Sequence, residues 1–339
     1  MTRRREVSVA FQGNKTLAEY AALAELAEHL GFDAVGVYAD LGFQPAIVPL
    51  LAMARATRRV RLGPAALNTW LLHPVEIAGQ LAALDAASNG RAYLGLARGA
   101  WLEAIGIEER APVARLREAI GAIRHLLAGR EDEFASDLFP LPAGRLLRYE
   151  VARPDIPLLI GTWGPKLAAL AGEVADEVKI GGSTNPALVP VMRRYLAIGE
   201  AQARRPLGTV GIVMGAVTVV DEDGPAARTR ARQQVARYLP VVAPLDPTVD
   251  LPVDLLRRMA ALVAARRDDE AAAMVPDDVL DRFAFSGTPD QIVRQTEALF
   301  AAGATRVEFG TPHGFTDAAG VTLLGERALP ALRETLNRA

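Results

Sequence analysis

Charged, amide and imidazole side chains that can hold or protonate a ligand recur just after short apolar segments of this sequence. Asp40, Asn68 and Arg98 each follow such a segment within a few residues. Glu103 and His313 follow two others in the same way. Carboxylates and imidazoles are common proton-transfer groups in enzymes. If the segments are parallel strands, their carboxyl ends meet at one edge, and the pattern predicts a single site there.

Residues 161–166, GTWGPK, predict a turn that opens a helix. Free backbone N–H groups and the positive end of the helix dipole at such a turn suit a phosphate group. Lys166 places a positive charge in the first helical turn, where it would otherwise be unfavourable, and this favours a functional interpretation. Glycine-rich turns between strands and helices are also common for structural reasons alone.

All three tryptophans, at positions 70, 101 and 163, lie near these residues. Their rings could line a site for a planar ligand, or each could pack beneath an inserted segment. The histidine pattern is mixed. His29 and His125 fall inside amphipathic helical patterns and are expected to be structural, whereas His73 begins a helix that it could cap. His313 is expected to contact substrate or to act as an acid–base group.

Several chemistries have no support in the sequence. There is no cysteine, no His-x-x-x-His pair and no Asp-rich loop, so no metal site is expected. There is no Gly-x-Ser-x-Gly elbow, and GLARGAW has the spacing of neither a dinucleotide fingerprint nor a phosphate-binding Walker loop.

The elements that must position these residues alternate regularly. Strands are expected at residues 6–11, 34–38, 60–66, 92–97, 157–160, 177–180, 209–220 and 305–309. Helices are expected at 16–30, 44–55, 73–87, 112–127, 165–172, 186–203 and 323–336. Eight strands alternating with helices are typical of an α/β TIM (β/α)8 barrel, whose active site lies at the carboxyl ends of the strands.

Two segments interrupt the alternation, after the fourth and seventh strands. Residues 131–156 are rich in proline and show no sustained period, and they are expected to cover the barrel mouth. Residues 221–282 contain helical patterns near 226–238 and 255–265, and Ser-Gly-Thr-Pro at 286–289 then predicts a helix start. With these insertions, residues 1–339 are expected to form a single domain.

Composition limits the partners. The chain has 339 residues, is 50% hydrophobic and has a formal net charge of −2, so neither nucleic acid nor an anionic membrane is expected as a partner. The basic start, MTRRREVSVAFQG, lacks a long apolar core. These features predict a cytoplasmic protein that acts on a small molecule.

At these residues the chain resembles the bacterial-luciferase-like superfamily of TIM barrels. It is most similar to the branch that uses the deazaflavin coenzyme F420, typified by methylene-tetrahydromethanopterin reductase. The resemblance covers nearly the whole chain and is carried by five segments: GFDAVGVYAD, RVRLGPAALN, LLHPVEIAGQLAALDAASNGRAYLGLARG, PLLIGTWGPKLAALAGEVADEVKIGG and FSGTPDQIVRQ.

The resemblance implies particular roles. Asp40 matches an acidic residue near the deazaflavin ring, and Ala65-Ala66 matches a bulge where the family holds a non-prolyl cis peptide against that ring. The other implied cofactor contacts are Asn68, Arg98, Gly99 and Glu103 for polar groups, Trp163, Gly164, Lys166 and Leu167 for the phosphate, and Gly181 and Gly182 for the same tail.

The sequence departs from the family pattern at two catalytic positions. The family often has His directly after the strand-2 Asp, where this chain has Leu41. Sugar-phosphate dehydrogenases of the family have Glu just after the strand-4 Gly, where this chain has Ala100, and this argues against glucose-6-phosphate as substrate. The proton donor is therefore open, with Asp40, Glu103 and His313 as the catalytic candidates.

Three functions remain on this basis. The first is an F420-dependent oxidoreductase that reduces a C=N or C=C bond by hydride transfer. The second is an FMN-dependent luciferase-like monooxygenase, and the third is a barrel that binds a flavin or deazaflavin without turning it over. By resemblance, the protein is expected to be a homodimer.

Overall fold

The computed structural model describes residues 5–144 and 146–338; residues 1–4 of the basic N-terminal stretch, residue 145 of the first insertion and residue 339 lie outside it. Its strands are β1 (Glu6–Phe11), β2 (Ala34–Val37), β3 (Arg61–Pro64), β4 (Leu94–Ala97), β5 (Leu158–Gly161), β6 (Glu177–Gly181), β7 (Gly211–Val220), β8 (Ala284–Gly287) and β9 (Arg306–His313).

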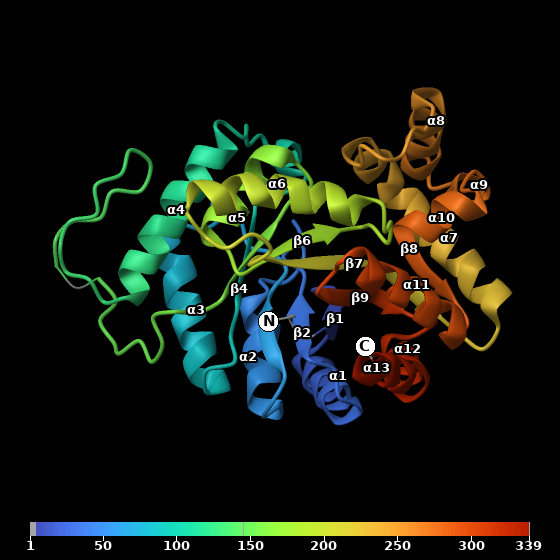
Figure 1. Ribbon diagram of the computed structural model, residues 1–339, viewed down its shortest axis with the longest axis horizontal. Helices are drawn as coiled ribbons and strands as arrows, with labels where there is room; N and C mark the ends of the chain where they lie inside the picture. Colours follow the sequence, from blue (N-terminus) through green and yellow to red (C-terminus); the bar gives the residue numbers. More distant parts are fainter. Residues whose placement is uncertain (1–4, 145, 339) are drawn as a thin grey trace.

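Eight of these strands form the predicted TIM barrel (Figure 1). They are parallel and run in the order β3-β2-β1-β9-β7-β6-β5-β4. Bridges from Leu62 to Ala92 and from Leu67 to Leu96 join the two end strands and close the ring. The largest apolar core lies between the strands and the surrounding helices.

A ninth strand, β8, was not predicted. It lies off the ring and pairs with the far end of β7, from Val217 opposite Ala284 to Val220 opposite Gly287. The strand is short and leads directly into the predicted helix start, where Thr288 and Gln291 form a capping box. Four residues are too few to show the alternating pattern that identifies a strand in a sequence.

The helices that surround the strands largely follow the predicted pattern. The regular helices are α1 (Leu17–Leu30), α2 (Ile47–Ala56), α3 (Pro74–Ser88), α4 (Pro112–Leu127), α5 (Pro165–Val174), α6 (Leu188–Gln202), α11 (Pro289–Ala302), α12 (Asp317–Leu323) and α13 (Leu329–Arg338). A short 3-10 helix, η1 (Leu102–Ile105), and a π-helical segment, η3 (Leu324–Ala328), complete this set. The C-terminal helix was expected to begin at residue 323, but helical structure already begins at Asp317.

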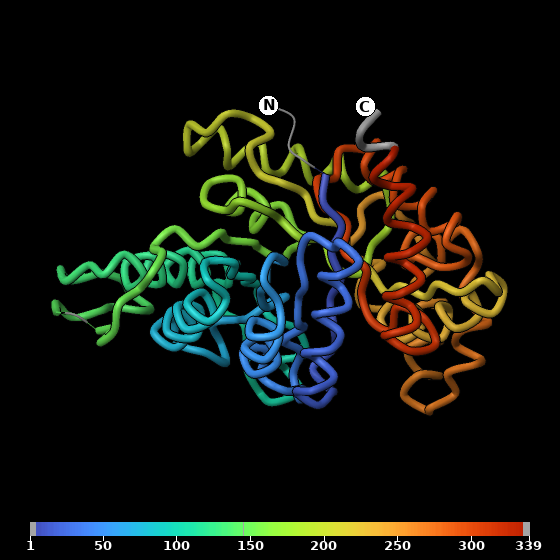
Figure 2. The backbone as a smooth tube through the Cα atoms, turned by 90° about the horizontal axis from the view of Figure 1, so that it is seen from below, coloured from blue at the N-terminus to red at the C-terminus, as the bar shows by residue number. Residues whose placement is uncertain are grey.

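The first insertion, residues 131–156, lies mostly outside the barrel mouth. In Figures 1 and 2 it extends away from α3 and α4 as a long loop. Tyr149 donates to the carbonyl of Gly79, and Arg153 pairs with Asp85, so this part of the insertion is held against α3. Phe139 lies nearer the rim, with its ring centre 5.4 Å from that of His73. The expectation that this segment covers the mouth is therefore wrong for most of its length.

The second insertion is helical, as expected, and has a core of its own. It contains α7 (Gly224–Val242), η2 (Ala243–Leu245), α8 (Val253–Ala264), α9 (Asp268–Ala273) and α10 (Asp277–Phe283), which lie together at one side of the barrel in Figure 1. Its apolar cluster includes partly buried Trp163, which also packs on the main core. The insertion thus reaches the carboxyl end of β5. That the whole chain is one domain stays a prediction.

No helix within residues 5–144 and 146–338 has the length and apolar character needed to span a lipid bilayer.

Candidate active site

Two layers of charged side chains fill the barrel beneath its mouth. In the lower layer the guanidinium of Arg306 donates to both carboxylate oxygens of Glu177, at 2.8 and 3.2 Å, while Arg61 pairs with Glu6 and lies 3.7 Å from Glu177. These four residues come from β9, β6, β3 and β1. Inward-facing positions alternate along parallel strands, so the next inward positions on β6 and β9 lie nearer the mouth.

Those next positions hold Lys179 and Glu308. The ammonium of Lys179 donates to the carboxylate of Glu308, and the two side chains are 8% and 1% exposed. The same ammonium lies 5.0 Å from the ring centre of Tyr38, the residue that follows β2. This cation–π contact and the ion pair together connect three walls of the barrel just below the mouth.

The expected cis peptide between Ala65 and Ala66 is present at the end of β3. The backbone N–H of Ala65 donates to the carbonyl of Val37 at 2.8 Å, and that of Leu67 donates to the carbonyl of Gly95 at 2.9 Å. The bulge is therefore held between β2 and β4. Contact of these two alanines with a cofactor ring stays a prediction.

Asp40 is fixed at the mouth by Gln12. The side-chain N–H of Gln12 donates to Asp40 at 2.8 Å, while its amide oxygen accepts from the backbone N–H of Gly13 at 2.9 Å. The backbone N–H of Gln12 in turn donates to the hydroxyl of Thr311 at 3.1 Å. The half-buried carboxylate of Asp40 is thereby oriented by the ends of β1 and β9.

Asn68 shapes the loop that follows β3. Its side-chain oxygen accepts from the backbone N–H groups of Trp70 and Leu71, at 3.1 and 3.0 Å. Within the part of the chain that the structure describes, its NH2 group makes no hydrogen bond and remains free to donate. Trp70 is covered by the guanidinium of Arg115, 4.1 Å from a ring centre, so this tryptophan packs within the protein.

Arg98, expected to contact the cofactor, pairs with Glu109. Burial raises the pKa of Glu109; Arg98 opposes this shift, and Glu103 adds to it. Glu103 is exposed on η1, close enough to Glu109 for this effect. Arg98, Glu103 and Glu109 therefore form one cluster beside the mouth. Gly99, in the loop after β4, has a φ of 112°, a left-handed conformation that favours glycine.

A hydrogen bond joins the turn after β5 to the turn after β6. The indole N–H of Trp163 donates to the carbonyl of Gly181 at 3.1 Å. A side chain at Gly164 or at Gly181 would meet no atom within 4 Å, so open space lies beside both. Lys166 is exposed at the start of α5, Leu167 is buried behind it, and Gly182 has a φ of 87°.

His313 is fully buried at the end of β9, away from solvent. One ring nitrogen lies 2.7 Å from a carboxylate oxygen of Asp317, and the other lies 3.1 Å from the carbonyl oxygen of Phe309. Lys15 pairs with Asp317 at 2.9 Å. With both nitrogens engaged, the ring supports the end of β9 in this conformation, and its acid–base role stays a prediction.

The Asp317 contacts predict an acid-sensitive contribution to stability. Burial raises the pKa of Asp317, but the hydrogen bond from His313 and the charge of Lys15 outweigh burial and leave the pKa below its usual range. Because its pKa is lower in the folded protein, the Asp317 carboxylate stabilises the fold at pH values above its unfolded-state pKa of about 3.9. This contribution is lost as the pH falls through the pKa of the folded state. We expect Asp317→Asn to flatten the fall in Tm between about pH 5 and pH 2; an unchanged acid slope would contradict this.

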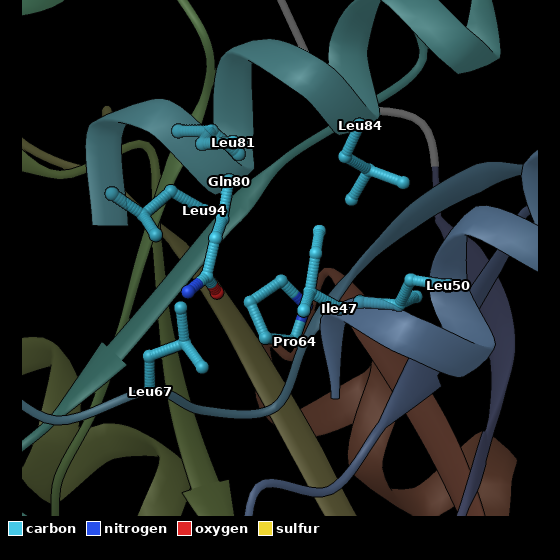
Figure 3. Close-up of a pocket in the computed structure, with 8 residues that line it drawn as sticks. All are labelled: Ile47, Leu50, Pro64, Leu67, Gln80, Leu81, Leu84 and Leu94. Carbon is cyan, nitrogen blue, oxygen red and sulfur yellow. The ribbon is translucent and has the colours of Figure 1, made fainter. Parts of the chain in front are cut away.

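A small apolar cavity lies outside the barrel wall, between α2, β3, α3 and β4 (Figure 3). Its volume is about 10 Å3, and leucines and Pro64 form most of its lining. This space is at the lower limit for a single water molecule, so it is a packing void and no ligand site. Across residues 5–144 and 146–338, no group of three or more His, Asp or Glu side chains could hold a metal ion.

The sequence reasoning missed Tyr38, Lys179, Glu308 and Glu109. A signal was present for two of them, because β6 (EVKIG) and β9 (RVEFGTPH) carry charges at alternate positions within buried strands. Such alternation places the charged residues on one face of each strand. No comparable signal identified Glu109, which lies in an irregular segment between η1 and α4.

Known proteins of similar sequence and similar fold support the barrel assignment. The sequence model of the family described as luciferase-like monooxygenase matches residues 4–306. A 5,10-methylenetetrahydromethanopterin reductase from Archaeoglobus fulgidus is 32% identical, covering 91% of this chain and 94% of its own. An F420-dependent glucose-6-phosphate dehydrogenase from Nakamurella multipartita is 29% identical over 93% of both chains. The structure of a coenzyme F420-dependent tetrahydromethanopterin reductase from Methanopyrus kandleri has the same fold, with a TM-score of 0.87, 23% identity and coverage of 97% and 99%.

Proposed function

Because the chain belongs to the luciferase-like monooxygenase family, we propose that it is an F420-dependent oxidoreductase that transfers a hydride between the deazaflavin and a small organic substrate. The observation that carries this proposal is the 32% identity with the Archaeoglobus reductase over 91% of the chain. The F420-dependent dehydrogenase relative, similar along nearly its whole length, supports the same cofactor.

The residues at the mouth fit coenzyme F420, which supplies hydride chemistry when bound. The open space beside Gly164 and Gly181 leaves room for the cofactor tail near the start of α5 and Lys166. Trp163, Leu167 and Gly182 complete this part of the proposed site. The remaining proposed contacts, toward the ring and its polar groups, are Asp40, Ala65, Ala66, Asn68, Arg98, Gly99 and Glu103.

Lys166 provides a direct test of the tail site. We expect Lys166→Met to raise the Kd for F420 about 10- to 100-fold, because a hydrogen bond to a charged group contributes about 1.5–3 kcal/mol. Arg257→Met, which removes an exposed cation on α8, is the matched control and should leave the Kd unchanged. Fluorescence titration of the cofactor measures both. Equal affinities for the two variants would exclude Lys166 from the site.

The substrate is proposed to be reduced at a C=N or C=C bond, and this reaction needs a proton as well as a hydride. Among the three candidates, the geometry favours Asp40, since Gln12 holds it at the mouth. Glu103 is exposed on η1, and both ring nitrogens of His313 are already engaged. Asp40 is therefore proposed as the principal acid–base residue, with Glu103 and His313 as the alternatives.

An anaerobic assay tests the proposed reaction. Reduced F420 should be oxidised by the protein in the presence of small imines or activated alkenes, and the oxidation should stop without substrate. FMN-dependent monooxygenation is the second candidate, because the matching family is described by that activity. This second candidate would be favoured if the protein consumed oxygen with reduced FMN and did not oxidise reduced F420. Binding of F420 without turnover of any acceptor would favour the non-catalytic barrel.

We also propose that the protein is a cytoplasmic homodimer. The resemblance to this family, whose members commonly pair as dimers, supports the pairing. Light scattering coupled to size-exclusion chromatography would give a mass near twice that of one chain. A monomeric mass would refute the dimer.

A further inference from the structure

The hydroxyl group of Tyr38 lies near the mouth of the barrel. Among residues 5–144 and 146–338, this hydroxyl makes no hydrogen bond, whereas those of Tyr20 and Tyr238 donate to the carbonyls of Gln12 and Phe283. The Tyr38 side chain is half-buried at the end of β2. A half-buried donor without a partner can serve a ligand at little cost in protein contacts.

Residues of two other strands, β6 and β9, hold the ring of Tyr38 in place. Lys179 of β6 lies 5.0 Å from its ring centre, and a side chain at Gly310 of β9 would collide with its hydroxyl oxygen. Because Lys179 is anchored in turn by Glu308, the buried ion pair positions the ring from below. Gly310 follows Glu308 by two positions on β9, so the hydroxyl lies just above the ion pair and nearer the mouth.

The surroundings keep this hydroxyl protonated. Burial, followed by the negative charges of Glu308 and Asp40, raises the pKa of Tyr38 well above its ordinary value. The charged and titratable groups that face it are Lys179, Glu308, Asp40, Tyr238 and Tyr93. At neutral pH the group is thus a hydrogen-bond donor, as an acid for a newly formed anion must be.

We propose that Tyr38 is a further catalytic residue, which donates its hydroxyl proton to the nitrogen of a C=N substrate as the neighbouring carbon receives the hydride. This inference rests on the proposed function. The hydride brings two electrons to carbon, the C=N π electrons move to nitrogen, and the Tyr38 proton forms the new N–H bond. Solvent at the mouth returns a proton to Tyr38, with Asp40 as the carboxylate that relays it.

A C=N substrate suits this donor, because the lone pair of its nitrogen can accept a hydrogen bond from the hydroxyl before the hydride arrives. Lys179 is a positioning residue in this scheme, since it acts only through the ring of Tyr38. Its ammonium would also stabilise the tyrosinate that exists before the proton returns.

The experiment compares Tyr38→Phe with Tyr93→Phe. Tyr93 lies deeper, 1% exposed and beside Arg306, so its variant controls for loss of a barrel hydroxyl. We expect Tyr38→Phe to lower kcat for imine reduction about 100-fold, with the Kd for F420 changed less than about threefold. Tyr93→Phe should keep wild-type kcat. Equal kcat for the two variants would overturn the proposal.

Titration of the cofactor-free protein gives a second readout. The difference in tyrosinate absorbance between wild type and Tyr38→Phe reports ionisation of Tyr38, which should occur above the ordinary value of about 10. Glu308→Gln removes a negative charge that raises this pKa, so the transition should move to lower pH. A Tyr38 transition at its ordinary value, or one unmoved by Glu308→Gln, would contradict the arrangement. Failure of the wild type to bind F420 would instead refute the proposed function.

Discussion

Arg306→Met is expected to lower the free energy of unfolding by about 3–5 kcal/mol, because it leaves a buried carboxylate without its partner. Arg306 is fully buried and donates to both oxygens of Glu177. Burial alone would lower its pKa, but Glu177, assisted by Glu308 and Glu6, raises the pKa above the ordinary value. The guanidinium is therefore charged in the folded protein and neutralises the lower layer of the barrel.

Arg327→Met is the matched control. Arg327 pairs with Glu222 at 2.8 Å, but the two side chains are 58% and 61% exposed. Solvent screens such a pair, so its loss should cost less than about 1 kcal/mol. Chemical denaturation of both variants measures the difference. Similar free energies of unfolding for the two variants would show that the barrel network tolerates an unpaired Glu177, contrary to the expected result.

Asp40→Asn is expected to lower kcat about 100- to 10,000-fold, the usual contribution of a positioned proton-transfer group. The substitution keeps the size of the side chain and an oxygen that can still accept from Gln12, so the geometry of the mouth should survive. The amide cannot carry the proton that a carboxyl group carries. The Kd for F420 should therefore change far less than kcat.

Three variants separate this role from a general effect of charge. Asp290→Asn removes an exposed negative charge at the start of α11 and should retain wild-type kcat. Glu103→Gln and His313→Gln test the two alternative acid–base residues, and their effects on kcat should be smaller than that of Asp40→Asn. If Glu103→Gln or His313→Gln has the larger effect, the assignment of Asp40 is wrong.

The barrel could be predicted from the sequence because its signals are local and repeated. Each strand–helix unit has its own markers, such as Gly31 in the left-handed conformation after α1 and His73 capping α3 through Val75. Parallel strands joined by helices have few closed arrangements, so the topology follows from the alternation. The same reasoning failed for β8, whose pairing with β7 is set by distant contacts.

The mouth residues were predictable in position but less so in their contacts. Strand ends identified Asp40 and Arg98, but not that Gln12 would fix the first or that Glu109 would pair with the second. Hydrogen bonds between side chains from different strands depend on register and tilt, which no local pattern contains. The contacts of His313 have a similar origin, because its ring lies between the carbonyl of Phe309 in β9 and the carboxylate of Asp317 at the start of α12.

Titration of the wild-type protein with F420 and, separately, with FMN tests the assignment of the cofactor most directly. Quenching of intrinsic tryptophan fluorescence can follow both ligands, since Trp163 borders the proposed tail site. The proposed function predicts a Kd for F420 at least about tenfold below that for FMN, a difference of about 1.4 kcal/mol. Tighter binding of FMN than of F420 would contradict it.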